Sequence, residues 1–359
     1  MQPVAFLIDV PTAKKLTDEY IQDFCQRRAS EAMELGPTYA QLWQSIEKLI
    51  LAGGKRFRPY MLLATYQAYQ PTQPLASVLP AAVAQELIHS AMLVHDDIID
   101  RDTIRYGVQN IAGQYTENYK AFVHDETERA HMSLSAALLA GDALIADAHK
   151  VLRKTELPTH LIDHAQDILN SVIFEVIGGE LLDTEVAFLP KGSISAHTIA
   201  RYKTASYSFV GPITTGAVLA EAPETDITIL REFSIMLGVG YQLRDDILGT
   251  FGDEAVTGKS ITTDIKEGKR TYLIEQFDIL ATTEQAQKFN KIFRRYDATN
   301  DEIQIAKQLL IDTGALHKVE QKINELHQQS LDKIEQLSLS DETKKIYKGL
   351  VEYCLSRDK

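Results

Sequence analysis

Three aspartates stand close together near the end of one strongly apolar stretch of the sequence. Residues 81–104 repeat apolar side chains every three or four positions, which predicts a helix with one buried face, and Asp96, Asp97 and Asp100 lie near its end. On a helix, Asp96 and Asp100 share a face about 6 Å apart. Like charges at this spacing and at a helix C-terminus are destabilising. The cluster therefore indicates a compensating cation, and Mg²⁺, which prefers oxygen ligands, fits these groups.

A second acidic cluster follows the same pattern much later in the chain. Another apolar helix is predicted over residues 230–248, with Gln242, Asp245 and Asp246 near its end. One such cluster alone is equally compatible with a solvated acidic helix end. Two clusters of this kind, each followed by basic residues, favour metal binding.

Basic residues accompany both clusters. They are Lys55, Arg56 and Arg58 in a compact turn over residues 53–59, Arg101 and Arg105 after the first cluster, and Lys259, Lys266, Lys269 and Arg270 after the second. Each of them alone is most simply a surface charge. Acids and bases alternating around two helix ends are what a magnesium–diphosphate site requires, because carboxylates hold the metal while Lys and Arg hold phosphate oxygens.

The elements that must position these residues are predicted to be helices. Helical periodicity runs from about residue 38 almost to the end, strand-like alternation is scarce, and no linker divides the chain. We expect an all-α fold: one domain over residues 1–359, with residues 1–37 as an N-terminal helical extension. Ten or more helices form its bundle, some of them long enough to line a deep central cavity.

Composition narrows the class of protein further. The chain has 359 residues and a formal net charge of −13, which argues against a general nucleic-acid binder. Its two cysteines, Cys25 and Cys354, lie at opposite ends and form no disulfide framework, so we expect a cytoplasmic location. The sequence shows no secretory signal and no apolar run of about 18 residues, so no membrane segment is expected.

Two glycine-containing patterns fail as nucleotide-binding motifs. The stretch over residues 252–260 has five residues between its glycines where a P-loop needs four, and residues 238–240 lack the third glycine of a dinucleotide fingerprint. His89 lies seven residues before Asp96, so it projects from nearly the same helical face. It is equally compatible with a buried polar histidine.

Five blocks, in order, resemble motifs of the trans-isoprenyl diphosphate synthase (polyprenyl synthetase) family, and in particular its geranylgeranyl diphosphate synthase-like members. Residues 54–59 (GKRFRP) resemble its GKxxRP motif, and residues 95–100 (HDDIID) its first aspartate-rich motif, DDxxD. Residues 203–204 match its KT element, residues 242–248 (QLRDDIL) its second aspartate-rich motif, and residues 257–259 the TGK that follows. The resemblance covers roughly residues 38–355.

The resemblance implies an isoprenoid synthase fold and chain elongation. An allylic diphosphate condenses head to tail with isopentenyl diphosphate and releases diphosphate, which can itself remove the final proton. It also implies up to three Mg²⁺ ions, a homodimer, and a product that can be delivered to a membrane.

The family resemblance also implies a role for each residue of this chain that matches a motif position. Asp96, Asp100 and Asp245 match the Mg²⁺ ligands, with Asp97 and Asp246 in support. Arg105, Lys203, Lys259 and Lys269 match positions around the allylic diphosphate, and Lys55, Arg58 and His89 match positions that bind isopentenyl diphosphate. Thr204 and Gln242 match polar groups near the reacting carbons.

Two departures from the family pattern keep an alternative open. Tyr106 stands where a second arginine is usual, and Gly249 stands where a third aspartate is common; Asp253 and Asp264 are candidates to replace that aspartate. The alternative is a non-catalytic regulatory subunit of a heteromeric prenyl diphosphate synthase, although such subunits generally lose their acidic motifs. A terpene cyclase is disfavoured, because the second motif lacks the Ser or Thr that a cyclase carries.

The size of the side chains that precede Asp96 on the predicted helix indicates the length of the product. The growing chain is expected to pass along the helix below Asp96, where Met92 and Ala91 lie four and five positions earlier. Short-product members of the family often carry aromatic residues there. Ala91 is small and Met92 is flexible, so we expect a product of C20 or longer, although both residues are equally compatible with core packing.

Overall fold

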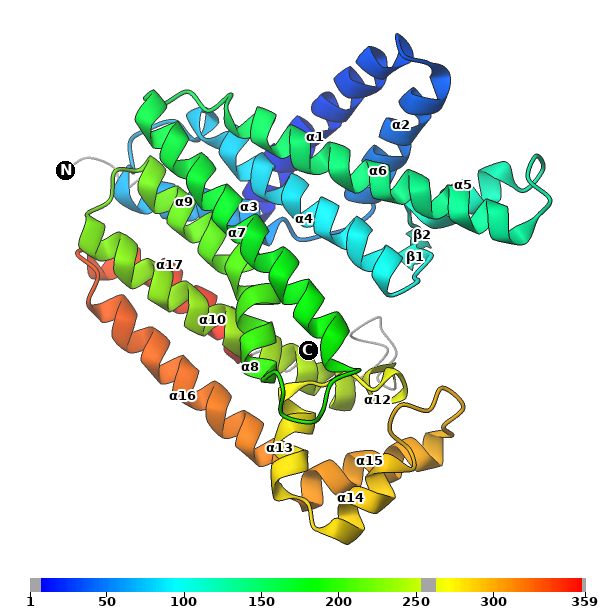
Figure 1. Cartoon of the computed structure of the whole chain (residues 1–359). Helices are drawn as coiled ribbons and strands as arrows, with labels where there is room; N and C mark the ends of the chain where they lie inside the picture. The colour runs from blue at the N-terminus through cyan, green and yellow to red at the C-terminus, as the bar shows by residue number, and fades with distance from the viewer. Residues whose placement is uncertain (1–7, 253–262, 357–359) are drawn as a thin grey trace. The chain divides into compact units, whose positions relative to one another are not determined.

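The computed structural model describes residues 8–252 and 263–356, and in them the chain is almost entirely α-helical (Figure 1). It divides into two compact units. The first runs to Asn170 and includes Pro212–Ala222, and the second comprises Ser171–Gly211 and Pro223–Lys359. The all-α prediction, with more than ten helices among the described residues, is confirmed. The predictions of one domain and of a central cavity stay predictions.

The first unit is built around α4, which packs against α6, and around α1, which packs against α2. Trp43, Leu62 and Leu87 are among its fully buried side chains. Its elements are α1 (Val10–Met33), α2 (Pro37–Leu51), α3 (Phe57–Tyr69), the short 3₁₀ helix η1 (Leu75–Ser77), α4 (Leu79–Ile99), β1 (Ile104–Arg105), β2 (Val108–Gln109), α5 (Ile111–Tyr119), α6 (Glu126–Leu152), the start of α7 (Thr159–Val186), and most of α9 (Gly211–Leu219).

The second unit is built around α10, which packs against η2, α16 and α17. Phe233, Phe277 and Tyr347 are buried in its core. Its elements are the rest of α7, α8 (Ala196–Ile199), the π-helix η2 (Ala200–Val210), α10 (Glu224–Phe251), α12 (Thr263–Glu267), α13 (Tyr272–Leu280), α14 (Thr283–Asn290), α15 (Asn300–Asp312), α16 (Ala315–Glu335) and α17 (Asp341–Leu355).

Local sequence explains where many helices begin. The Asp9 side chain accepts a hydrogen bond from the Thr12 amide at the start of α1, and Ser340 caps α17 through the Thr343 amide. Capping boxes start α14 and α15. Prolines occupy the first turn of α1, α2 and α4, where a missing N–H costs nothing.

One small feature was not expected from the sequence. β1 and β2 form a two-stranded antiparallel hairpin after α4. Tyr106 and Gly107 link the strands with φ values of 53° and 75°, the left-handed conformation that two-residue hairpin turns require. Strands of two residues are too short to show a periodic pattern. Among the described helices, none combines the length and apolar character needed to cross a bilayer.

Candidate active site

The three aspartates at the end of α4 occupy three different environments. The helix ends at Ile99, and the Asp100 amide donates to the Asp96 carbonyl over 2.8 Å. Asp96 is partly exposed, Asp97 is buried and Asp100 is exposed. The predicted acidic helix end is present, and Asp96 and Asp100 retain the solvent access that a ligand to a metal–diphosphate complex needs.

Asp97 is held by its neighbours. Nε of Arg105 donates to Asp97 Oδ1 over 2.6 Å, and Nδ2 of Asn110 donates to Asp97 Oδ2 over 2.9 Å. Burial raises the Asp97 pKa, and these two hydrogen bonds oppose that rise. Arg105 also reaches Asp96, with Nη2 3.2 Å from Oδ2. Asp97 therefore fixes Arg105 beside Asp96.

The hairpin that carries Arg105 rests on the cationic turn of residues 53–59. A Cβ atom built on Gly53 would lie 2.6 Å from Cγ of Tyr106, so the tyrosine ring lies directly over this glycine. Tyr106 therefore has a structural explanation here: it fastens the hairpin to the turn. Within the turn, Lys55 is exposed, Arg58 is partly buried and Arg56 is buried.

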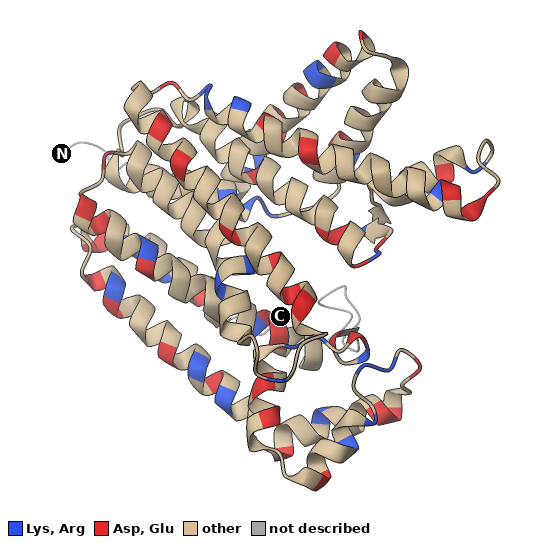
Figure 2. Cartoon of the chain, viewed as in Figure 1, with Lys and Arg blue, Asp and Glu red and all other residues tan. Residues whose placement is uncertain are grey.

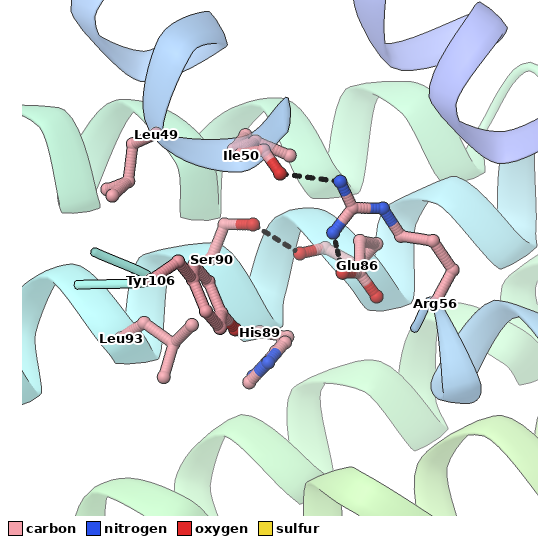
Figure 3. A pocket seen from close by; sticks show the side chains of 8 residues that line it. All are labelled: Leu49, Ile50, Arg56, Glu86, His89, Ser90, Leu93 and Tyr106. Atoms are coloured by element: carbon pink, nitrogen blue, oxygen red, sulfur yellow. Dashed lines mark hydrogen bonds and ion pairs between the residues drawn. The ribbon is translucent and has the colours of Figure 1, made fainter. Parts of the chain in front are cut away.

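A pocket with an empty volume of about 250 Å³, which includes open solvent, lies beside this turn (Figure 3). It is lined by Leu49, Ile50, Arg56, Glu86, His89, Ser90, Leu93 and Tyr106. The pKa of His89 is well below its ordinary value, because desolvation and the nearby Arg58, Arg105 and Arg56 guanidinium groups disfavour the imidazolium. His89 is therefore neutral at neutral pH and can both donate and accept a hydrogen bond.

In the second unit, Lys203 and Thr204 lie on a π-helix, η2, an arrangement frequent at functional sites. Glycines let the neighbouring helices approach it closely. A Cβ atom on Gly179 of α7 would lie 2.2 Å from the Lys203 amide nitrogen, and one on Gly238 of α10 would lie 2.5 Å from Cα of Ala205. Neither position tolerates a side chain without backbone movement, so both glycines fix the position of the π-helix.

Thr204, Gln242 and Asp246 form a hydrogen-bonded row. The Thr204 hydroxyl donates to Gln242 Oε1 over 2.6 Å, and Gln242 Nε2 donates to Asp246 Oδ1 over 2.8 Å. Because Asp246 accepts from the amide nitrogen, the Gln242 carbonyl oxygen must face Thr204. The sequence grouped Gln242 with Asp246, and the family resemblance paired Thr204 with Gln242; the structure links all three by hydrogen bonds.

Acidic groups accumulate near the end of α10. Burial raises the pKa of Asp246 to about 8, and the nearby Asp264 and Asp245 carboxylates contribute to the rise. A Cβ atom on Gly249 would lie 2.6 Å from Asp264 Oδ2. Gly249 therefore leaves the space that the Asp264 carboxylate uses.

Lys203 is held by two acids that the sequence analysis did not select. Its Nζ lies 3.0 Å from Glu180 Oε1 and 2.6 Å from Asp183 Oδ2, both on α7. Their i, i+3 spacing after the glycine pair at 178–179 is the signal that could have identified them. Lys269 is largely exposed and lies 3.8 Å from Asp264 Oδ1.

Two candidate residues, Lys259 and Asp253, lie outside the described residues. Acidic and basic residues are mixed at the end of α4 and around α12 (Figure 2). Across residues 8–252 and 263–356, no group of three or more His, Cys, Asp or Glu side chains is arranged to hold a metal ion by itself.

The chain is similar to known proteins over most of its length. The polyprenyl synthetase family model matches residues 40–310. A geranylgeranyl diphosphate synthase of Methanosarcina mazei is 30% identical over 318 residues, which cover 89% of this chain and 90% of the relative. A geranylfarnesyl diphosphate synthase of Aeropyrum pernix is 28% identical and covers 96% of this chain and 100% of the relative.

A solved structure is also similar to this chain over nearly its whole length. The crystal structure of a geranylgeranyl pyrophosphate synthase from Corynebacterium glutamicum, complexed with isoprenyl diphosphate and magnesium, is similar with a TM-score of 0.90 and 28% identity. The match covers 98% of this chain and 100% of the solved chain.

Proposed function

The chain belongs to the polyprenyl synthetase family and is a prenyltransferase, and on that premise we propose that it condenses an allylic diphosphate with isopentenyl diphosphate head to tail. The reaction releases diphosphate, depends on Mg²⁺ and gives a product of C20 or longer. The observation that carries this proposal is the hydrogen-bonded row of Thr204, Gln242 and Asp246 next to Lys203. It combines a fixed dipole with a cation, which a reaction through a carbocation and a diphosphate leaving group requires.

Ionisation of the allylic C–O bond leaves negative charge on the departing diphosphate. Lys203, Arg105 and Lys269 are the described cations proposed to stabilise it, together with Lys259. Lys203 is already paired with Glu180 and Asp183, so its ammonium group is held in place before substrate binds.

The carbocation requires electron-rich oxygens that do not react with it. The Thr204 hydroxyl donates a hydrogen bond to Gln242 Oε1, so the lone pairs of the hydroxyl oxygen remain available to face positive charge. We propose that the Thr204 and Gln242 oxygens stabilise the cation while isopentenyl diphosphate attacks. Lys55, Arg58 and His89 are proposed to hold isopentenyl diphosphate, and the departing diphosphate to take the final proton.

The donor chemistry of the two acidic helix ends fits Mg²⁺. Asp96 and Asp100 keep solvent access, and the Asp245 and Asp264 carboxylates lie near Asp246, a concentration of acidic groups that a divalent cation would offset. We propose that Asp96, Asp100 and Asp245 ligate the ions, up to three in number, with Asp97, Asp246 and Asp264 in support. Bound magnesium would screen the diphosphate charge and make diphosphate a better leaving group.

The remaining proposals concern assembly and location. Leu134, Leu138 and Leu139 are exposed along α6, and we propose that a second copy of the chain covers them in a homodimer. A cytoplasmic location also stays a proposal. The regulatory-subunit alternative was based on Tyr106 and Gly249, and each has a local structural explanation: Tyr106 packs over Gly53, and Gly249 leaves space for Asp264. We therefore do not favour that alternative.

The activity can be tested by following diphosphate release from the purified protein. Release is expected only when Mg²⁺, an allylic diphosphate and isopentenyl diphosphate are all present. Release from the allylic diphosphate alone at the same rate would indicate hydrolysis or cyclisation and would contradict the proposal.

A change of product length tests the proposed path of the growing chain. Ala91 has no exposed surface, whereas Met92 is partly exposed, so Met92 is the more accessible of the two positions. Met92→Phe is expected to shorten the main product by narrowing the path, and Ala91→Phe to do the same at a cost of about 1–3 kcal/mol in stability from overpacking. Products are sized by chromatography, with thermal unfolding as the control. An unchanged product distribution in both folded variants would reject this path.

Substitution of Gly249 tests whether Asp264 supports magnesium binding. Gly249→Ala places a methyl group 2.6 Å from Asp264 Oδ2, so the carboxylate must move. We expect the Mg²⁺ concentration for half-maximal activity to rise about three- to tenfold, equivalent to about 0.7–1.4 kcal/mol. Gly349→Ala on α17 is the matched control, because its Cβ meets nothing within 4 Å. The same Mg²⁺ dependence in all three proteins would remove Asp264 from the site.

A further inference from the structure

Arg56 is a buried residue of the cationic turn, and it is not among the residues expected to bind substrate. It is buried, and its backbone has a φ of 53°, a left-handed conformation that is unusual for a non-glycine residue. It is also the residue immediately before α3. Such a conformation persists where surrounding contacts hold it.

Those contacts come from three different helices. Nε of Arg56 donates to Asp18 Oδ1 on α1 over 2.6 Å. Nη1 donates to Glu86 Oε1 on α4 over 2.9 Å, and Nη2 donates to the carbonyl of Ile50 on α2 over 2.5 Å (Figure 3). A Cβ atom on Gly54 would lie 2.5 Å from Nη1, so the turn folds back over the guanidinium group.

This arrangement fixes the backbone between two residues of the isopentenyl diphosphate site. Lys55 precedes Arg56 and Arg58 follows it by two positions, so their side chains start from a backbone whose conformation Arg56 sets. The carboxylates of Asp18 and Glu86 also form ion pairs with Arg56, and these ion pairs hold its guanidinium group in the buried position. Without the Asp18 carboxylate, the Nε donor of Arg56 would lose its charged acceptor and the turn would lose this ion pair with α1.

We propose that Asp18 is a positioning residue for the isopentenyl diphosphate site, acting through Arg56 on Lys55 and Arg58. Asp18 belongs to α1, which ends before residue 40, where the family match begins. The N-terminal helix thus contributes to substrate recognition without touching substrate. The inference rests on the proposed function only for the identity of the substrate that the turn binds.

Asp18→Asn tests the proposal by steady-state kinetics. The KM for isopentenyl diphosphate is expected to rise about tenfold, the size of one charge-assisted hydrogen bond, with kcat and the KM for the allylic diphosphate within about twofold of wild type. Asp23→Asn is the matched control, because Asp23 is an exposed residue of the same helix that pairs only locally with Arg27. Glu86→Gln, which changes the other carboxylate, is expected to give the same selective rise.

A second readout does not depend on activity. Amide hydrogen exchange of the substrate-free protein is expected to quicken at least fivefold over residues 54–58 in Asp18→Asn, and to stay unchanged in α10 and in Asp23→Asn. Unchanged exchange in the turn would overturn the proposal. A fall in kcat together with equal rises in the KM values for both substrates would also overturn it. If wild type itself forms no prenyl product, the proposed function fails, and the exchange result still decides whether Asp18 orders the turn.

Discussion

Asp96→Asn is expected to lower kcat by about 10³-fold at saturating substrates and Mg²⁺, with little change in thermal stability. Asp96 is partly exposed at the end of α4, and Nη2 of Arg105 lies 3.2 Å from its Oδ2. The neutral amide is a weak magnesium ligand, and the loss of one preorganised charge at a developing diphosphate costs about this much. The measurement is the rate of diphosphate release together with a thermal unfolding curve.

Asp97→Asn provides the matched control at the adjacent position. Its carboxylate is buried and accepts from both Arg105 and Asn110, so the single acceptor oxygen of asparagine leaves one of these two donors without its acceptor. Stability is expected to fall by about 2–4 kcal/mol, in contrast to Asp96→Asn. If Asp96→Asn retained more than about a tenth of the wild-type kcat, the assignment of Asp96 as a metal ligand would be wrong.

Thr204→Val is expected to lower kcat by about 10²-fold while the two KM values change little. The variant keeps the shape of the side chain but removes the hydroxyl that faces Gln242, so both the stabilising oxygen and the orientation of the amide are lost. Thr204→Ser, which keeps the hydroxyl, is expected to retain most of the wild-type rate. Equal rates for the valine and serine variants would show that the Thr204 oxygen plays no part in the chemistry.

The parts of the site that the sequence predicted are those set by local periodicity. The spacing of apolar residues before Asp96 and before Asp245 located two helices and the acids near their ends. The contact between Gln242 and Asp246 follows from their i, i+4 spacing on one helix. The prediction of chain elongation rested on the order of five motifs and not on any one residue.

The parts that the sequence did not predict depend on contacts between distant segments. Thr204 and Gln242 are 38 positions apart, as are Asp18 and Arg56, and no periodic pattern links either pair. The close approach of Gly249 to Asp264 depends on how the chain returns after α10. The π-helix was not predicted, and its close contacts, at Gly179 of α7 and Gly238 of α10, join segments that are far apart in the sequence.

The central claim is that this chain joins isopentenyl units to an allylic diphosphate. The most direct measurement incubates the purified protein with Mg²⁺, labelled isopentenyl diphosphate and each short allylic diphosphate in turn, and then sizes the labelled products. We predict labelled prenyl diphosphates of C20 or longer that disappear when Mg²⁺ is chelated. No incorporation of label with any allylic diphosphate would contradict the claim.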